Sequence, residues 1–363
     1  MQSFVYSAVP ARVLLGAGLR SRLPQEMDAL GLRRALLVTT RSQRDRAREL
    51  ARRLETRCAD VFDRVVMHVP AEAAADVCAA ARAVDADCAI ALGGGSAIGM
   101  AKVVAARLDV PVIALPTTYA GSEMTTHYGV TTDGMKKVER TPKVLPRVVI
   151  YDPELSVSLP AAVSGPSGMN GLAHCVEALY AEDANPVTSL MAEEGIGAFG
   201  RALPRIAADP GDLGARGEAF YGAMLSGIAL TSAGICLHHK LCHTLGGTFN
   251  LPHAEVHAVV LSHVVAYNTE AAPLAIARVA RALGVADAAR GLQDLARRVG
   301  APTSLKEIGM PHADLDRAAR LASQSPYFNP APVSYAGIRA LLDDAYEGRP
   351  TRASSDRFHA AAH

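Results

Sequence analysis

The sequence predicts an α/β domain with a parallel sheet, followed by an all-α domain. The chain has 363 residues, which is more than one hydrophobic core usually serves. Its first part alternates short β-rich apolar runs with helical patterns, and its second part replaces those runs with long periodic segments rich in Ala and Leu. We therefore expect an α/β domain over residues 1–155, a helical domain over residues 156–350 and a tail over residues 351–363.

The α/β domain is predicted from its alternating strand and helix patterns. Apolar runs indicate strands near residue 35, near residue 65, at 88–92, at 111–119 and at 147–153. Between them, the Arg-rich stretch after Arg41, the Ala-rich stretch 73–84 and the stretch 96–108 have helical patterns. This order implies a parallel sheet, in which ligands bind at the loops that follow the strands. Segment 119–152 is polar and turn-rich ahead of the final strand.

Composition excludes several classes of function. With 37 Lys plus Arg against 36 Asp plus Glu, the chain has no basic excess that would attract nucleic acid or an anionic membrane. No apolar run approaches the roughly 20 residues of a membrane-spanning helix, and we expect a cytoplasmic protein. The six cysteines lack zinc-type spacing, which favours buried thiols in a reducing compartment. Cys242 as a nucleophile is disfavoured, because nothing near it resembles an acyl-transfer site.

A glycine-rich loop lies between a predicted strand and a predicted helix. It reads GGGS, and its unhindered backbone N–H groups at a helix start suit a phosphate. The loop is not the GxGxxG fingerprint, and a tight turn without a ligand is the alternative. Hydroxyl-bearing residues end the next strand and are candidates for the same ligand, with a simple turn as their alternative. The candidate cofactor-binding residues here are Gly93, Gly94, Gly95, Ser96, Thr117, Thr118 and Tyr119.

Histidines recur at helical spacing in the second domain. Asn170 and His174 are one turn apart, and so are His239 and His243, so each pair shares a helix face. His253 stands where a new apolar run begins, so three helical segments could converge. The spacing suits a divalent metal, but the position expected to hold a carboxylate is an amide. For each histidine alone, a hydrogen-bonded core residue is the competing interpretation.

These motifs together resemble the iron-containing alcohol dehydrogenase family over about residues 8–345. The resemblance rests on the GGGS loop, the PTT strand end, the GSE turn, VLPRVVIYDPEL and the HxxxH…PH pattern. It implies a dinucleotide-binding α/β domain, a helical domain and a metal held by one Asp and three His. Those positions match Asn170, His174, His239 and His253 here.

Two departures from the family make the chain similar to its maleylacetate reductase branch. The metal-binding Asp is Asn170, and the Asp usual in GGGSxxD is Gly99. YAGSEMT and MNGLAHCVEALYA also match this branch. The resemblance implies reduction of the carbon–carbon double bond of maleylacetate, or a substituted maleylacetate, to 3-oxoadipate in bacterial degradation of aromatic compounds. It further implies NADH or NADPH as cofactor, no required metal and a homodimer. Ala331 departs from the branch, where a basic residue is usual.

Roles follow from this chemistry. We expect His243 to donate a proton to the substrate, and His174, His239 and His253 to hydrogen-bond its oxygens. Thr40 stands where an acidic residue would bind a ribose hydroxyl, so we expect NADPH to be tolerated beside NADH.

A dicarboxylate substrate also calls for fixed cations, although a basic run is usually a solvated face. The basic candidates are Lys136, Lys137, Arg140 and Lys240. The substrate-binding residues that we expect are Asn170, Lys136, Lys240 and Tyr327.

Two other functions compete with this one. The first is a metal-dependent alcohol or aldehyde reductase in which the amide oxygen of Asn170 still binds iron or zinc. The second is a nucleotide-binding protein that has lost catalysis, since both aspartates are absent.

Overall fold

The chain forms two compact units. The computed structural model describes residue 4 and residues 6–9, 11–67, 69–132, 135–324 and 327–351, without the side chains of Met135 and Lys136. An α/β unit covers Ala8–Leu159, and a helical unit covers the chain from Pro160 together with the residues before Ala8. The division lies four residues after the predicted one, between 159 and 160 instead of 155 and 156. The reason is that Leu155 is buried in the core of the α/β unit.

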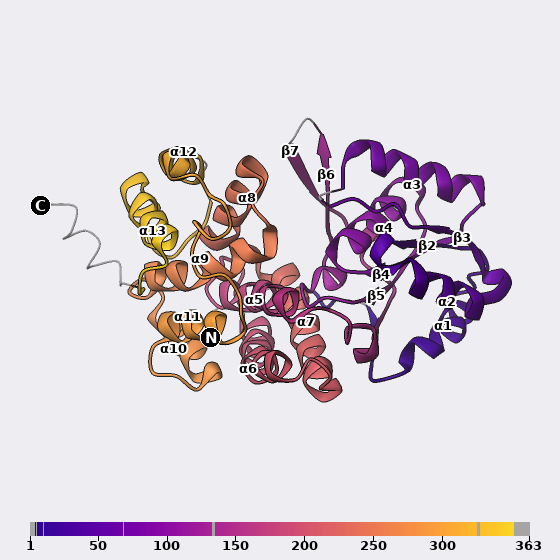
Figure 1. Cartoon of the computed structure of the whole chain (residues 1–363), viewed down its shortest axis with the longest axis horizontal. Coiled ribbons are helices and arrows are strands. Elements are labelled where there is room, and N and C mark those ends of the chain that lie inside the picture. Colours follow the sequence, from indigo (N-terminus) through magenta and orange to yellow (C-terminus); the bar gives the residue numbers. More distant parts are fainter. Residues whose placement is uncertain are drawn as a thin grey trace, which may run out of the picture. The chain divides into compact units, whose positions relative to one another are not determined.

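The α/β unit is built on a six-stranded, fully parallel sheet (Figure 1). The strand order is β1-β8-β5-β4-β2-β3. The bounds are β1 (Arg12–Leu15), β2 (Ala35–Thr39), β3 (Cys58–Phe62), β4 (Cys88–Gly93), β5 (Val112–Pro116) and β8 (Val148–Tyr151). Every residue of β2, β4, β5 and β8 is buried, which explains their continuous apolar runs. The predicted α/β and helical fold class is confirmed.

Helices cover both faces of this sheet. They are α1 (Leu23–Ala29), α2 (Arg44–Leu54), α3 (Ala71–Ala83) and α4 (Gly95–Leu108). Because side chains alternate along a strand, Leu37 of β2 packs with residues of α1 and α2, while Leu36 and Val38 pack with α3 and α4. The glycine loop therefore enters α4 directly from a central strand.

Three elements of this unit differ from the predictions. The run near residue 65 is not a strand, and its residues Val66 and Met67 are exposed. The strand in this region is β3, which begins seven residues before position 65. β3 pairs only with β2, and an edge strand needs little apolar sequence. The polar segment also contains an antiparallel hairpin, β6 (His127–Thr132) and β7 (Met135–Arg140), which was not predicted, although Tyr128 and Val130 of β6 pack against the core of the α/β unit.

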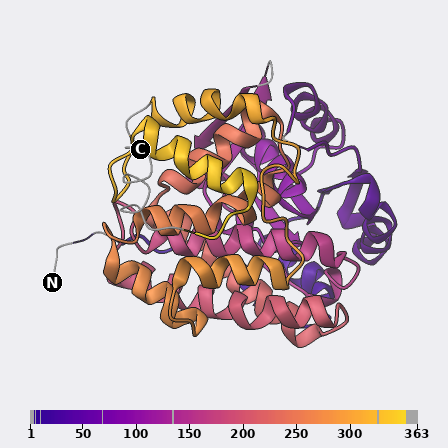
Figure 2. The same ribbon diagram turned by 60° about the vertical axis from the view of Figure 1, so that its left-hand side comes forward.

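The second unit is helical, as predicted. Its helices are α5 (Ala161–Ala178), α6 (Pro186–Ala208), α7 (Leu213–Ala233), α8 (Leu237–Phe249), α9 (His253–Asn268), α10 (Pro273–Leu283), α11 (Ala288–Arg298), α12 (Leu315–Ser323) and α13 (Tyr335–Glu347). α5 contacts α6, α7 and α9, and α9 contacts α8, α11 and α13 (Figure 2). Both α5 and α9 are buried along most of their length, which places them at the centre of the unit.

Two further predictions concern the C-terminal tail and membrane association. Of the predicted tail, residues 352–363 lie outside the described residues. Within the described part of the chain, no single helix is long and apolar enough to cross a membrane. The bent pair α7 and α8 meets that criterion by length and composition only.

Candidate active site

The predicted cofactor-binding residues gather at one edge of the sheet. Strands β2, β4 and β5 are neighbours and parallel, so their carboxyl ends lie side by side. Thr40 follows β2, the glycine loop follows β4, and Thr117 and Thr118 follow β5. Residues far apart in the sequence thus meet where open α/β sheets bind ligands.

The glycines of the loop are required by its geometry. Gly93 has φ +149°, and a Cβ there would lie 2.9 Å from Ala97 Cβ. A Cβ on Gly94 would lie 2.8 Å from Thr118 Cγ2 and 2.9 Å from Thr118 Oγ1. Gly94 is the N-cap of the 14-residue helix α4, and no side chain caps that helix start. The free N–H groups of the first turn therefore suit an anion.

Tyr119, a predicted cofactor contact, is buried at the end of β5. Its side chain is fully buried, and its hydroxyl lies 3.3 Å from Ser156 Oγ as a hydrogen-bond donor. Ser156 in turn donates to the carbonyl oxygen of Pro153. Tyr119 therefore holds the turn after β8 against the end of β5, and the sequence run of hydroxyl residues concealed this structural role.

A buried lysine, which the sequence interpretation missed, anchors the loop beyond Thr118. Lys102 of α4 is 1% exposed. Its ammonium group donates to the carbonyl oxygens of Ser122 (2.6 Å), Thr125 (2.7 Å) and His127 (3.0 Å) and to Thr125 Oγ1 (2.9 Å). Burial lowers the pKa of Lys102 to about 7. The lysine ties the loop after β5 to the helix that begins at the glycines.

Glu123, in the same loop, is a second buried ionisable group. It is 1% exposed, and Tyr151 of β8 donates to its Oε1 atom at 2.8 Å. Burial raises the pKa of Glu123 to about 7, although Lys102 and the Tyr151 hydroxyl oppose that change. The loop is therefore fixed from two sides, by α4 and by the central strand β8.

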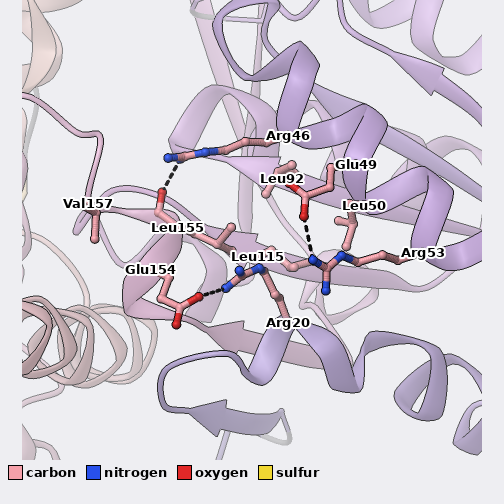
Figure 3. A pocket seen from close by; sticks show the side chains of 10 residues that line it. All are labelled: Arg20, Arg46, Glu49, Leu50, Arg53, Leu92, Leu115, Glu154, Leu155 and Val157. Carbon is pink, nitrogen blue, oxygen red and sulfur yellow. Dashed lines mark hydrogen bonds and ion pairs between the residues drawn. The ribbon is translucent and has the colours of Figure 1, made fainter.

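A cavity of about 380 Å³ lies beside this edge, in the α/β unit (Figure 3). Its apolar wall includes Leu92 and Leu115, which precede the glycine loop and Thr117 along their strands. Its arginines already have partners. Arg46 donates to the carbonyl oxygen of Leu155 at 2.7 Å, Arg20 pairs with Glu154 and Arg53 pairs with Glu49 (Figure 3). The cavity therefore offers a mixed surface of leucines and paired charged side chains beside the carboxyl ends of β4 and β5.

The predicted histidines come together in the helical unit, on α5, α8 and α9. The rings of His174 and His239 stack with centroids 4.9 Å apart. His253 begins α9, as expected from the sequence, and His243 lies one turn after His239, with ring centroids 6.2 Å apart. Asn170 Oδ1 and His239 Nε2 are buried atoms without a hydrogen-bond partner. These two atoms are therefore candidates for contacts with a bound molecule.

His257 is a central member of this cluster that the sequence interpretation missed. Its ring lies 4.6 Å from His253, 5.1 Å from His239 and 6.1 Å from His174, measured between centroids. Its Nδ1 shares a 2.8 Å hydrogen bond with His238 Nε2. Burial lowers the pKa of His238 and of His257 well below the usual value, so both rings are neutral. The i, i+4 spacing of residues 253 and 257 was the available signal.

Glu177 of α5 is the carboxylate of the cluster, and it was also missed. It is fully buried and accepts hydrogen bonds from the backbone N–H groups of Cys236 (2.9 Å) and His238 (2.6 Å). It also accepts one from His239 Nδ1 at 2.5 Å. A carboxylate only accepts, so Nδ1 of His239 carries the hydrogen and Nε2 of the neutral ring has a lone pair. The expectation that His239 donates to a substrate therefore holds only for its charged form.

The basic candidates divide between the two units. Lys136 is in β7 and its side chain is outside the described residues. Lys137 pairs with Glu139 at 3.2 Å, and Arg140 donates to Thr126 Oγ1 at 3.3 Å, both on the hairpin of the α/β unit. These three residues therefore belong to the α/β unit, whereas the histidines belong to the helical unit.

Lys240 and Tyr327 do lie together in the helical unit. The ammonium nitrogen of Lys240 is 5.9 Å from the centroid of the Tyr327 ring. Tyr327 donates to the carbonyl oxygen of Ala322 at 3.0 Å, so its hydroxyl is engaged within the protein. Among the described residues, no carboxylate pairs with Lys240, which lies between His239 and His243 on α8. Its charge is therefore available to an anionic ligand.

The donor set at the four predicted metal positions has an amide where the family resemblance implies a carboxylate. Asn170, His174, His239 and His253 offer one amide oxygen and imidazoles, with no anionic group. Glu177 already accepts three N–H groups. Enzyme sites for iron or zinc commonly include a carboxylate or thiolate whose charge offsets the cation.

A different trio of residues in the cluster has ligand atoms within 4.8 Å of one another. Its members are His238, Cys242 and His257, all buried. Cys242 Sγ lies 3.5 Å from His238 Nε2, and burial raises the pKa of its thiol well above the usual value. The neutral thiol and the two neutral rings contact one another, so they form a hydrogen-bonded group within the cluster.

Two family models match the chain, one in each unit. The model described as iron-containing alcohol dehydrogenase matches residues 10–153, and the model of the C-terminal part of the Fe-containing alcohol dehydrogenase family matches residues 165–346. The chain belongs to the iron-containing alcohol dehydrogenase family. The resemblance predicted from the motifs is thereby confirmed, and so is the prediction of an oxidoreductase.

Within this family, the chain is similar over nearly its whole length to maleylacetate reductases. It is 51% identical to the maleylacetate reductase of Burkholderia cepacia, over 97% of this chain and 100% of the relative. The crystal structure of maleylacetate reductase from Agrobacterium tumefaciens has a TM-score of 0.93 at 49% identity, covering 96% of this chain and 100% of that one. A 1,3-propanediol oxidoreductase structure has a TM-score of 0.88 at 28% identity, covering 95% and 100%.

Proposed function

We propose that this protein is a maleylacetate reductase, which reduces the carbon–carbon double bond of maleylacetate or a substituted maleylacetate to give the 3-oxoadipate skeleton. One observation carries the proposal: buried Asn170, one helical turn before buried His174 on α5, is an amide where metal-dependent members of the family have a carboxylate. The similarity to maleylacetate reductases over 96–97% of the chain supports it.

NADH or NADPH would be held at the glycine loop and would supply a hydride to the alkene carbon β to the keto group. The protein must then stabilise negative charge on the keto oxygen and protonate the α carbon. The cluster contains polar groups for both tasks. Asn170 can donate through its amide NH₂, the rings of His174 and His253 lie with it, and a charged His239 donates through Nε2.

His243 is the proposed proton donor to the α carbon. It lies one helical turn from His239 on α8, at the side of the cluster. Neutral His238 and His257 are packed into the core, whereas His243 is exposed on α8. Replacing it with Asn should lower kcat while the affinity for NADH, measured by fluorescence, is retained.

Lys240 is the proposed anchor for a substrate carboxylate. It is a cation without a carboxylate partner among the described residues, and it lies on α8 beside the proposed proton donor. A point charge on a flexible stem tolerates substituted dicarboxylates. Lys137 and Arg140 have partners on their own hairpin and are weaker candidates for this role.

The cofactor is proposed to bind along the carboxyl edge of the sheet. Its pyrophosphate would lie at the start of α4, and the cavity lined by Leu92 and Leu115 together with paired charged residues would accept the adenine end. Thr40, whose hydroxyl is 3.0 Å from Ser42 Oγ, replaces the acidic residue that would repel a 2′-phosphate. Both coenzymes should therefore support turnover. A preference for NADH above about a thousandfold, roughly 4 kcal/mol, would contradict this interpretation of Thr40.

The deciding experiment is NADH oxidation with freshly generated maleylacetate, with and without a chelator. We expect turnover that is unchanged after chelation. Turnover of simple aldehydes that disappears with the chelator would favour a metal-dependent alcohol or aldehyde reductase, in which the Asn170 oxygen is a ligand. Binding of NADH without oxidation by either substrate would indicate a protein that has lost catalysis.

A further inference from the structure

Glu177 is a buried carboxylate whose hydrogen bonds all point to the start of α8. It is 0% exposed, and its Oε1 and Oε2 atoms accept the N–H groups of His238 and Cys236 at 2.6 and 2.9 Å. Cys236 is the N-cap of α8, and no side chain of its own caps that helix. Glu177 therefore takes the place of a local cap from the neighbouring helix α5.

The same carboxylate defines the state of one ring. Oε2 accepts from His239 Nδ1, so the hydrogen of the ring is on Nδ1 and the ring plane is fixed by the bond. The opposite nitrogen, Nε2, is buried without a partner. The ring of His239 also stacks on that of His174, 23° from parallel, which limits rotation.

We propose that Glu177 is a positioning residue for the reaction: by holding Nδ1–H of His239, it determines that Nε2 is the atom that meets the substrate's keto oxygen. The identity of the oxygen as the substrate's keto oxygen rests on the proposed function. The geometry of Glu177 and His239 does not. When the ring is charged, Nε2–H donates to the oxygen while the negative Glu177 offsets the positive ring. When the ring is neutral, Nε2 is an acceptor.

The placement of Glu177 follows from helix geometry. It is three residues after His174 and seven after Asn170, so all three share one face of α5. One helix face thus presents an amide, an imidazole and the carboxylate that holds a second imidazole. Carboxylates that orient functional histidines typically affect activity about 10- to 100-fold when removed.

The first experiment observes the tautomer of His239 in the unmodified protein, and a variant serves only to assign the signals. Protein labelled with ¹⁵N-histidine is examined by long-range ¹H–¹⁵N NMR, and the His239 resonances are assigned by their disappearance in His239→Gln. We expect a hydrogen on Nδ1 of His239. A ring with hydrogen on Nε2 and none on Nδ1 would overturn the proposal.

The second experiment measures kcat and KM for maleylacetate in Glu177→Gln and Glu177→Asp. Glutamine keeps the size but has a single acceptor oxygen for three N–H groups, so the ring loses its fixed state. We expect kcat to fall about 10- to 100-fold and the KM for NADH to stay within about twofold. The matched control is Glu182→Gln, five residues further on and exposed, which should retain wild-type kcat.

A double-mutant cycle separates positioning from stability. If Glu177 acts through His239, adding Glu177→Gln to His239→Ala should lower kcat by less than about threefold further. An independent, full-sized loss in that background, or a folded Glu177→Gln with wild-type kcat, would refute the proposal. If maleylacetate is not reduced at all but Nδ1 carries the hydrogen, the proposed function fails while the positioning of His239 stands.

Discussion

Gly94 and Thr118 lie so close together at the carboxyl edge of the sheet that a single carbon added to Gly94 would clash with Thr118. A Cβ on Gly94 would lie 2.8 Å from Thr118 Cγ2 and 2.9 Å from Thr118 Oγ1, closer than real Cβ contacts come. Thr118 follows β5 and Gly94 follows β4, and these two strands are paired neighbours. The contact therefore sets how closely the glycine loop approaches the next loop, and the cofactor is expected to bind where these two loops meet.

Replacing Gly94 with Ala should weaken cofactor binding more than it weakens the fold. The added methyl must displace Thr118, and both loops belong to the proposed cofactor site. We expect the KM for NADH to rise at least about tenfold, equivalent to about 1.4 kcal/mol. The measurement is a coenzyme titration at saturating substrate, with thermal unfolding recorded alongside.

Gly99→Ala is the matched control for this variant. Gly99 is in the same helix, α4, but its Cβ would meet only Val69 Cγ2 at 3.4 Å, an ordinary contact. Alanine in a helix interior is favoured over glycine by about 1 kcal/mol, so this variant should be as stable as wild type or more stable. A similar loss of NADH affinity in both variants would show that the Gly94–Thr118 contact is not the cause.

Asn170→Asp should convert the histidine cluster into a metal site. The change restores the anionic group that the present donor set lacks, among His174, His239 and His253. We expect the variant to retain about one zinc or iron per chain after dialysis, and wild type to retain much less. Metal analysis of both proteins, purified without chelator, is the measurement. Equal retention would show that the amide oxygen suffices as a ligand.

The sequence allowed the central parts of the fold to be predicted because their signals are local. The strands β2, β4, β5 and β8 are apolar throughout, since both faces of the sheet are covered. The pairs on α5 and α8 followed from helical spacing, which needs no tertiary information. The glycine loop followed from its place between a strand and a helix.

The remainder depended on contacts between segments that are distant in sequence. Glu177 and the residues that it holds are 59 to 62 positions apart, and nothing in the local sequence distinguishes it from a surface glutamate. Lys102 was hidden in the same way, because lysine usually lies on the surface and this one is held by carbonyl oxygens 20 to 25 residues away. The contact of Tyr119 with Ser156 was hidden likewise, because Ser156 follows another strand.

Lys240→Ala should raise the KM for maleylacetate without changing the KM for NADH. The lysine has no carboxylate partner among the described residues, so its loss leaves no unpaired charge and should cost little stability. An ion pair with a substrate carboxylate in a partly buried site corresponds to about a 10- to 100-fold change in KM. Lys240→Arg, which keeps the charge, should recover much of the loss. An unchanged KM in Lys240→Ala would assign the carboxylate to another cation.

Glu123 should make the protein less stable as the pH rises through the weakly acidic range. Burial raises its pKa from 4.5 to about 7 in the folded state. Between these values the folded protein binds more protons than the unfolded chain, so the free energy of unfolding falls with increasing pH. Lys102 contributes no pH dependence of stability below about pH 6. Its pKa of about 7 keeps it protonated in the folded state at these pH values, and it is protonated in the unfolded chain as well. The expected loss from Glu123 between pH 4.5 and 7 is on the order of 3 kcal/mol.

Glu123→Gln isolates this contribution, because glutamine cannot ionise and can still accept a hydrogen bond from Tyr151. Urea unfolding of both proteins at pH 5, 6 and 7 gives the difference in stability at each pH, and other carboxylates cancel in that difference. We expect wild type to lose stability relative to Glu123→Gln as the pH rises. A difference that is constant with pH would mean that Glu123 is already ionised at pH 5, held by the buried ammonium of Lys102.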